Sequence, residues 1–191
     1  MPSETKMDKR ACKIRFTAKL CRPKAMVEAV SWTFLIIPKD ASAKLPARGM
    51  TSVEGTLNGF PFQATLEPDG HGGHWLKVDQ NLRGAAGAEV GGLVSLEIAP
   101  VTVEPEPEVP EDLRKAVADA PPRASETWSD ITPLARRDWI HWITSGKRAE
   151  TRAKRIIVAV SKLSAGDRRP CCFDRSGMYS KSLSCPEADD A

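Results

Sequence analysis

The chain has 191 residues, of which 41% are hydrophobic and 28% charged, an ordinary composition for a protein with a buried core. Its 28 Lys and Arg against 25 Asp and Glu leave a net charge of +3, so global charge gives little support to a nucleic-acid or anionic-membrane partner. No apolar run approaches the ~20 residues of a membrane span, and we expect neither a span nor a secretion signal.

The cysteine pattern predicts a reducing environment. The five cysteines are an odd number, and Cys171 and Cys172 are adjacent, which does not match a disulfide framework. The expected location is therefore the cytoplasm.

Residues 1–103 have the pattern of a small β-barrel domain. Asn58 and Gly59 lie between two apolar segments, and they suit a type I′ hairpin turn, which needs positive φ at both central positions. Pro61 places part of the second arm at an edge or strand start. Six short strands without crossover helices favour a closed or nearly closed barrel. The expected strands are 14–20, 30–37, 50–57, 60–66, 75–78 and 90–103.

The second half has the pattern of a helical module. Glu and Pro alternate over 104–109, which predicts a semi-rigid linker. Helical periodicity follows over 110–175, with Thr132 as an N-cap before Pro133 and Gly166 as a helix stop. Residues 176–191 have little to bury and are expected to be a flexible tail.

Both halves resemble known bacterial families. Residues 32–38 (WTFLIIP) and 53–62 (VEGTLNGFPF) are similar to a small β-barrel domain of unknown function. Residues 139–143 (WIHWI) and 168–173 (RRPCCF) are similar to the YdeI/OmpD-associated family, often labelled bacteriocin-protection. The resemblance implies an α+β protein, with a double-split β-barrel followed by helices. It also implies a link to bacteriocin or envelope-stress tolerance, and it supplies no catalytic residues.

Metal and thiol chemistry have weak candidates. His71 and His74 flank two glycines, but zinc needs three or four ligands, so we interpret this segment as a tight turn with exposed imidazoles. Cys171 and Cys172 lack Cys-x-x-Cys spacing, although the neighbouring arginines keep a reactive thiol open. We expect no metal and no cofactor.

Aromatic and basic residues supply the candidate binding sites. Trp139 and Trp142 lie three apart on one helical face, which is more typical of core than of a stacking platform. The candidate ligand-binding residues in the barrel, whose aromatic members are equally candidates for plain core, are Trp32, Phe60, Phe62, Trp75 and Arg83. The candidate anion or partner surface consists of Lys147, Arg148, Arg152 and Arg155.

The basic residues also fit the solvated face of an amphipathic helix, with Arg152 turned inward to bridge elements. The leading hypothesis is a non-enzymatic binding or adaptor protein, with an unknown small ligand or protein partner. The alternative is a nucleic-acid-binding protein that uses the basic C-terminal helices. A weaker alternative is a thiol- or metal-dependent enzyme, because no nucleotide loop, nucleophile elbow or paired-carboxylate signature occurs.

Overall fold

The computed structural model describes residues 13–24, 32–146, 148–171, 173–174, 176, 178 and 183–189. The chain forms two compact units, Met1–Thr102 with Asp174–Ala191, and Val103–Phe173. The described strands all lie in the first unit, and they are β1 (Ile14–Lys19), β2 (Thr33–Ile36), β3 (Thr51–Leu57), β4 (Phe60–Pro68), β5 (His74–Val78) and β6 (Leu93–Pro100). The helices are α1 (Lys39–Ser42), α2 (Gln80–Ala85), α3 (Glu111–Ala118), α4 (Pro122–Asp130), α5 (Pro133–Thr144) and α6 (Ala149–Ala165).

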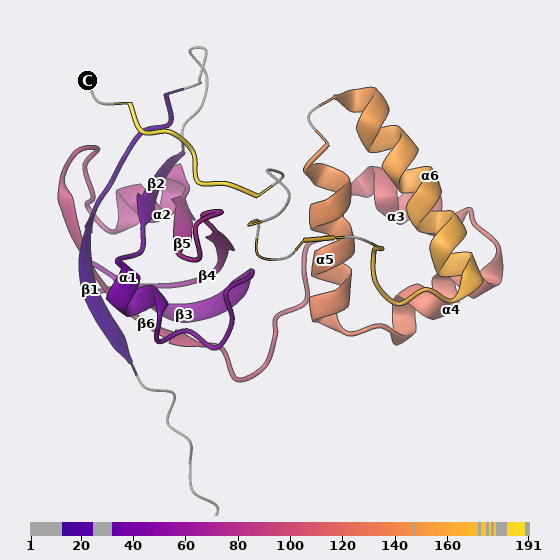
Figure 1. The fold of residues 1–191 in the computed structure, drawn as a ribbon, viewed down its shortest axis with the longest axis horizontal. Helices are drawn as coiled ribbons and strands as arrows, with labels where there is room; N and C mark the ends of the chain where they lie inside the picture. Colours follow the sequence, from indigo (N-terminus) through magenta and orange to yellow (C-terminus); the bar gives the residue numbers. More distant parts are fainter. Residues whose placement is uncertain are drawn as a thin grey trace, which may run out of the picture. The chain divides into compact units, whose positions relative to one another are not determined.

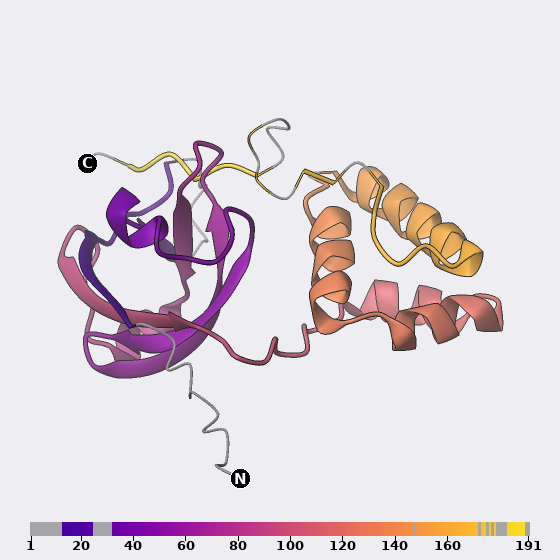
Figure 2. The same ribbon diagram turned by 60° about the horizontal axis from the view of Figure 1, so that its bottom comes forward.

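The first unit is a nearly closed barrel of six antiparallel strands in the order β1-β6-β3-β4-β5-β2 (Figures 1 and 2). The two end strands meet where the chain beyond β1 reaches β2. There the Cys21 N–H donates to the Phe34 carbonyl at 2.7 Å, and the Phe34 N–H donates to the Cys21 carbonyl at 2.9 Å. The barrel followed by helices confirms the expected α+β fold.

The hairpin predicted from the sequence joins β3 and β4. Asn58 has φ 49° and Gly59 has φ 86°, as a type I′ turn requires. Pro61 pairs with Thr56 of β3, whereas β4 does not pair with β5 until Glu67. At Pro61, β4 has no pairing with β5, so the missing N–H of this proline breaks no hydrogen bond between these strands. Pro61 is the second residue of β4, in agreement with its expected place at an edge or strand start.

Alternating side chains fill the barrel. Along β6, Val94, Leu96 and Ile98 are 1–2% exposed, whereas Leu93, the first residue of the strand, is 76% exposed. This period of two is the one expected for a strand with one buried face. The buried core of the unit comprises Ile14, Ala18, Leu20, Leu35, Ile37, Ala41, Leu45, Val53, Leu57, Leu66, Leu76, Val78, Val94, Leu96 and Ile98.

The second unit packs α3 to α6 around a separate core (Figure 1). The Thr132 Oγ1 accepts the Ala135 N–H at 3.3 Å at the start of α5, and Gly166 ends α6 with φ 91°. Both helix boundaries agree with the sequence signals. The buried core comprises Leu113, Val117, Ala124, Ile131, Ala135, Trp139, Ile143, Ile156, Ala159 and Leu163.

The described part of the C-terminal segment forms backbone hydrogen bonds with the barrel. The Lys24 N–H donates to the Glu187 carbonyl at 2.9 Å, and the Asp189 N–H donates to the Arg22 carbonyl at 2.8 Å. Leu183 is only 3% exposed. These contacts attach residues that the sequence assigned to a flexible tail.

Candidate functional site

A pocket of about 450 Å³ opens on the barrel between α1, the loop that follows it and the turn from β4 to β5. Its charged and titratable lining residues are Lys39, Arg48, Asp69 and His71. The remaining wall is formed by small or apolar residues and by one hydroxyl, Ser42. A hollow of this size with a few converging polar groups is typical of a small-molecule site.

Asp69 holds one wall of the pocket in place. Its Oδ1 accepts the His71 N–H at 2.7 Å and the Gly73 N–H at 2.8 Å, and its own N–H donates to the Gly73 carbonyl. Gly72 has φ 87°, and a Cβ built on it would lie 3.5 Å from the Arg48 Nη1. The Arg48 guanidinium therefore lies against the turn, over a position without a side chain.

Two cations of the pocket have no ion-pair partner among the described residues. Within the part of the chain that the structure describes, neither Lys39 nor Arg48 forms an ion pair or a side-chain hydrogen bond. The carboxylate of Asp69 already accepts two backbone N–H groups through one oxygen. The pocket thus combines two cations with one engaged carboxylate, a balance that favours an anionic ligand.

A buried serine–histidine pair adjoins the pocket. The Ser42 Oγ lies 2.6 Å from the Nδ1 of His74, and the His74 Nε2 lies 3.0 Å from the Gly49 carbonyl oxygen. A carbonyl only accepts, so the Nε2 carries the hydrogen and the Nδ1 of the neutral ring accepts the Ser42 hydroxyl proton. His74 is 1% exposed and Ser42 is 6% exposed.

Burial keeps His74 neutral. It lowers the pKa of His74 below the ordinary 6.5, and this effect outweighs the opposite influences of Asp69 and of the Gly49 and Ala47 carbonyls. The expectation of exposed imidazoles in this turn is therefore correct for His71 and wrong for His74. The reason is that His74 begins β5 and its ring is enclosed by residues distant in sequence, on α1 and at Gly49.

We expect the barrel to lose stability as the pH falls below about 6.5. The unfolded His74 takes up a proton near its ordinary pKa of 6.5, whereas the folded residue resists it because its pKa is lowered. The stabilisation is thus fully present above 6.5 and is lost as the pH falls toward the folded pKa. Urea unfolding between about pH 8 and pH 5, with hydrogen exchange of β3 and β6 amides, measures this loss.

His74→Gln removes the titrating ring, so the pH dependence of barrel stability should flatten in this variant. His71→Gln is the matched control, because this exposed residue of the same turn should leave the dependence unchanged. An unaltered slope in His74→Gln would contradict the assignment.

The candidate aromatic residues of the barrel lie in two separate places. The ring of Trp32 lies 6.3 Å from that of Trp75, and the Lys77 Nζ lies 5.0 Å from the Trp32 ring centre. Trp75 is 6% exposed and meets Phe34 edge-on at 6.2 Å, a typical core contact. This cluster does not line the 450 Å³ pocket.

Phe60 and Phe62 lie instead beside α2. Together with Leu82 and neighbouring residues they border a more open hollow of about 340 Å³. Phe60 is 41% exposed, and Arg83 in the last turn of α2 does not line this hollow. Ligand binding by these five candidates therefore stays a prediction, and the structure divides them into two groups with Arg83 apart.

The candidate basic surface of the helical unit is largely engaged in internal contacts. Arg152 binds Asp112 of α3 through its Nε at 2.7 Å and its Nη2 at 2.8 Å. Arg155 donates to the Trp142 carbonyl and, at 2.9 Å, to the Ser145 Oγ at the end of α5. Arg148 is exposed, and Lys147 lies outside the described residues. Two of the four cations thus connect helices. For Arg152 this agrees with the prediction that its side chain turns inward and bridges two elements.

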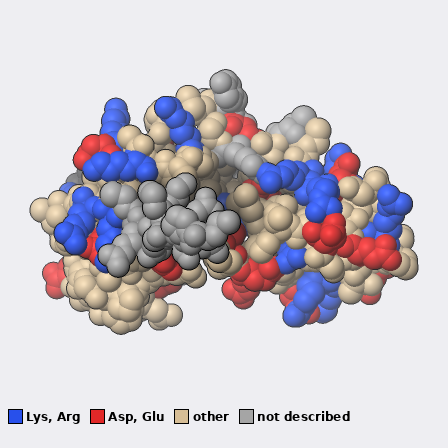
Figure 3. All heavy atoms as spheres, turned by 90° about the horizontal axis from the view of Figure 1, so that it is seen from below, with Lys and Arg blue, Asp and Glu red and all other residues tan. Residues whose placement is uncertain are grey.

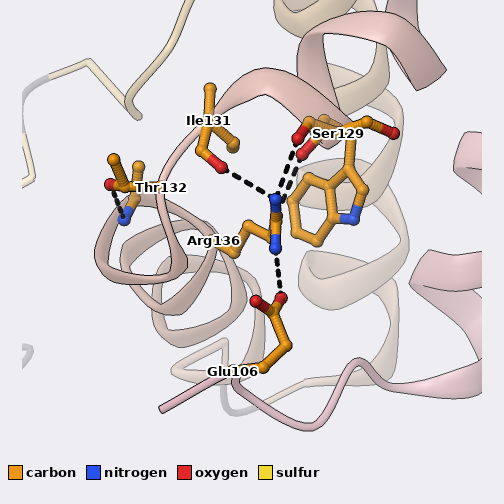
Figure 4. A network of polar contacts seen from close by, with 7 residues as sticks. Glu106, Ser129, Ile131, Thr132 and Arg136 are labelled. Atoms are coloured by element: carbon orange, nitrogen blue, oxygen red, sulfur yellow. Dashed lines mark hydrogen bonds and ion pairs between the residues drawn. The ribbon is translucent and has the colours of Figure 1, made fainter. Parts of the chain in front are cut away.

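The sequence analysis did not single out Arg136, a cation of this unit with several contacts (Figure 4). Its Nε donates to the Trp128 carbonyl at 3.0 Å, and its Nη2 donates to those of Ser129 at 3.0 Å and Ile131 at 2.8 Å. Its Nη1 pairs with Glu106. The last carbonyls of α4 lack helical partners, so a cation on the following helix was a detectable candidate.

A second charged group surrounds α5. Asp138 is 2% exposed and pairs with Arg169 at 3.5 Å, and Arg137 pairs with Glu104. His141 is half-buried, and burial lowers its pKa below the ordinary 6.5. These residues join α5 to the linker and to the chain after α6, so their contacts are first of all structural.

The fold and the pocket define a two-domain protein, a six-stranded barrel with a polar pocket followed by a helical module. The model of the domain of unknown function DUF1905 matches residues 16–98. The model described as bacteriocin-protection, YdeI or OmpD-associated matches residues 106–166. The first half of the chain is therefore similar to the DUF1905 domain, and the second half is similar to the YdeI/OmpD-associated, bacteriocin-protection family.

None of the curated proteins matches the chain. In the described residues, no helix has the length and hydropathy needed to cross a membrane. No group of three or more His, Cys, Asp or Glu that could hold a metal ion occurs among those same residues.

Proposed function

We propose that this is a binding protein whose barrel pocket holds a small anionic ligand, and that it acts in bacteriocin or envelope-stress tolerance. The observation that carries the proposal is the pair of cations, Lys39 and Arg48, at a pocket of about 450 Å³. The family description of residues 106–166 supports the tolerance role.

The pocket favours a carboxylate or phosphate ligand. A guanidinium and an ammonium both donate charge-assisted hydrogen bonds to such groups, and the guanidinium can do so bidentately. The backbone bonds of Asp69 fix the turn that supports Arg48, so the site is largely formed before a ligand arrives. A formed site saves the entropy of ordering a loop on binding.

Calorimetric titration with inorganic phosphate, succinate and citrate tests the proposal. We expect at least one of these anions to bind, and the double variant Lys39→Ala with Arg48→Ala to bind it at least about tenfold more weakly, a loss of ~1.4 kcal/mol. Lys44→Ala with Arg22→Ala removes the same charge at two exposed residues that do not line the pocket, and is the matched control. Absence of binding by every anion, or an equal loss in the control, would contradict the proposal.

We also propose a cytoplasmic location. Cys21 and Cys185 are free thiols, which a reducing compartment preserves. Alkylation of these thiols in intact cells and in lysates, followed by mass mapping, would reveal a disulfide if the location were oxidising.

The nucleic-acid alternative receives less support. On the face drawn in Figure 3, basic and acidic side chains are interspersed over the helical unit, at the right of the picture. Arg152 and Arg155 are engaged by Asp112 and by the end of α5. A phosphate-tracking surface needs a continuous set of available cations, which this arrangement does not provide.

We therefore expect labelled DNA and RNA oligonucleotides to bind weakly and to dissociate near ~0.15 M salt. Titrations across a salt series measure this. Submicromolar affinity at ~0.15 M salt, abolished by Lys147→Glu with Arg148→Glu, would favour the nucleic-acid function instead.

A further inference from the structure

We propose that Ser42 is a nucleophilic serine, with His74 as its general base, that accepts an acyl group from a small ester carrying a negative charge. The inference rests on the pocket of the proposed function and adds a reaction to it. Ser42 lines the same pocket as Lys39 and Arg48, so a substrate held there adjoins the hydroxyl.

The contact between the two side chains has the geometry of an activated nucleophile. The Ser42 Oγ is 2.6 Å from the His74 Nδ1, within the range of a nucleophile–base hydrogen bond. The opposite ring nitrogen is bound to the Gly49 carbonyl at 3.0 Å. This carbonyl fixes the ring orientation and the tautomer, which is the role of the third group in a catalytic triad.

The protonation state also suits a general base. Burial favours the neutral ring, which has its lone pair on the nitrogen that faces Ser42. The groups that face His74 are the Ser42 hydroxyl from α1, the carbonyls of Ala47 and Gly49 from the loop, and the Asp69 carboxylate from the turn. Asp69 acts in the opposite direction to burial, and it stabilises the imidazolium that forms during proton transfer.

The reaction balances without an external oxidant or metal. The Ser42 Oγ forms a bond to the acyl carbon while its proton passes to the His74 Nδ1, and the carbonyl oxygen takes the electron pair. Collapse of this adduct breaks the bond to the leaving alkoxide, which receives the proton from His74. Water, deprotonated by His74, then releases the acid and restores Ser42. Ester and water thus become acid and alcohol.

The cations of the pocket define the substrate class. Lys39 and Arg48 supply positive charge beside Ser42, which stabilises an oxyanion or a carboxylate of the substrate. An anionic ester should therefore react faster than a neutral ester with the same leaving group.

Labelling of the full chain with a fluorophosphonate, followed by intact mass and peptide mapping, tests the proposal. We expect one adduct per chain, on Ser42, that is absent in Ser42→Ala. His74→Gln should slow labelling by at least about 100-fold. The matched controls are Ser164→Ala and His141→Gln in the helical unit, both of which should label like the wild type.

Two measurements keep the test independent of variant folding. In the wild type the labelling rate should rise with pH as His74 loses its proton and then level off. The wild type should also hydrolyse 4-nitrophenyl hemisuccinate faster than 4-nitrophenyl acetate. Adducts spread over several serines, or a rate on Ser42 independent of pH, would overturn the proposal. If anions bind the pocket and Ser42 stays unlabelled, the reaction fails while the binding function stands.

Discussion

Gly55→Ala is expected to destabilise the barrel by about 3 kcal/mol or more. A Cβ built on Gly55 would lie 1.9 Å from the Glu97 carbonyl oxygen and 2.8 Å from the Ile98 Cα. Both are backbone atoms of β6, so no rotamer change relieves the clash, and β3 and β6 must separate where Gly55 pairs with Ile98. Urea unfolding, with hydrogen exchange of β3 and β6 amides, measures the loss.

Gly84→Ala is the matched control in the same unit. Gly84 lies in α2, and a Cβ there would have no atom within 4 Å. Alanine is the better helix former by about 1 kcal/mol, so this variant should be as stable as the wild type or slightly more stable. Equal unfolding midpoints for Gly55→Ala and Gly84→Ala would show that β6 yields to the added methyl group.

Arg136→Ala should destabilise the helical unit by about 3 kcal/mol. The guanidinium donates to the Trp128, Ser129 and Ile131 carbonyls and pairs with Glu106, while only 16% of the side chain is exposed (Figure 4). Removing it leaves several acceptors at the end of α4 without their donor. Urea unfolding, with hydrogen exchange of α4 and α5 amides, measures the change.

Two further variants define the cause of this loss. Arg136→Lys keeps the charge, but one ammonium cannot reproduce the planar fork, so it should recover less than half of the stability. Arg123→Ala removes an exposed cation of the same unit that forms no ion pair among the described residues. Its effect should stay within about 0.5 kcal/mol. An Arg136→Ala loss no larger than this would contradict the role of the network.

The positions of the turns and helix ends were determined by short segments of sequence. Asn58 and Gly59 specify the β3–β4 hairpin because a type I′ turn needs two residues that tolerate positive φ. Thr132 and Gly166 mark the ends of α5 and α6 for equally local reasons, a side-chain oxygen near free N–H groups and a left-handed backbone. The α+β order of the two domains follows from such segments taken together.

The candidate site was decided by tertiary structure. Ser42 and His74 are 32 positions apart, and His71 and His74, which look alike in sequence, are exposed and buried respectively. Nothing in the sequence distinguishes Gly55 from an ordinary strand residue. Only the close approach of the β6 backbone requires a residue without a side chain at this position. The hydrogen bonds of Arg136 likewise depend on where α4 ends, because the carbonyls that accept them lie there. Periodicity and turn chemistry report the conformation of neighbouring residues, whereas a pocket depends on contacts between residues far apart in the chain, which form only when the strands and helices pack.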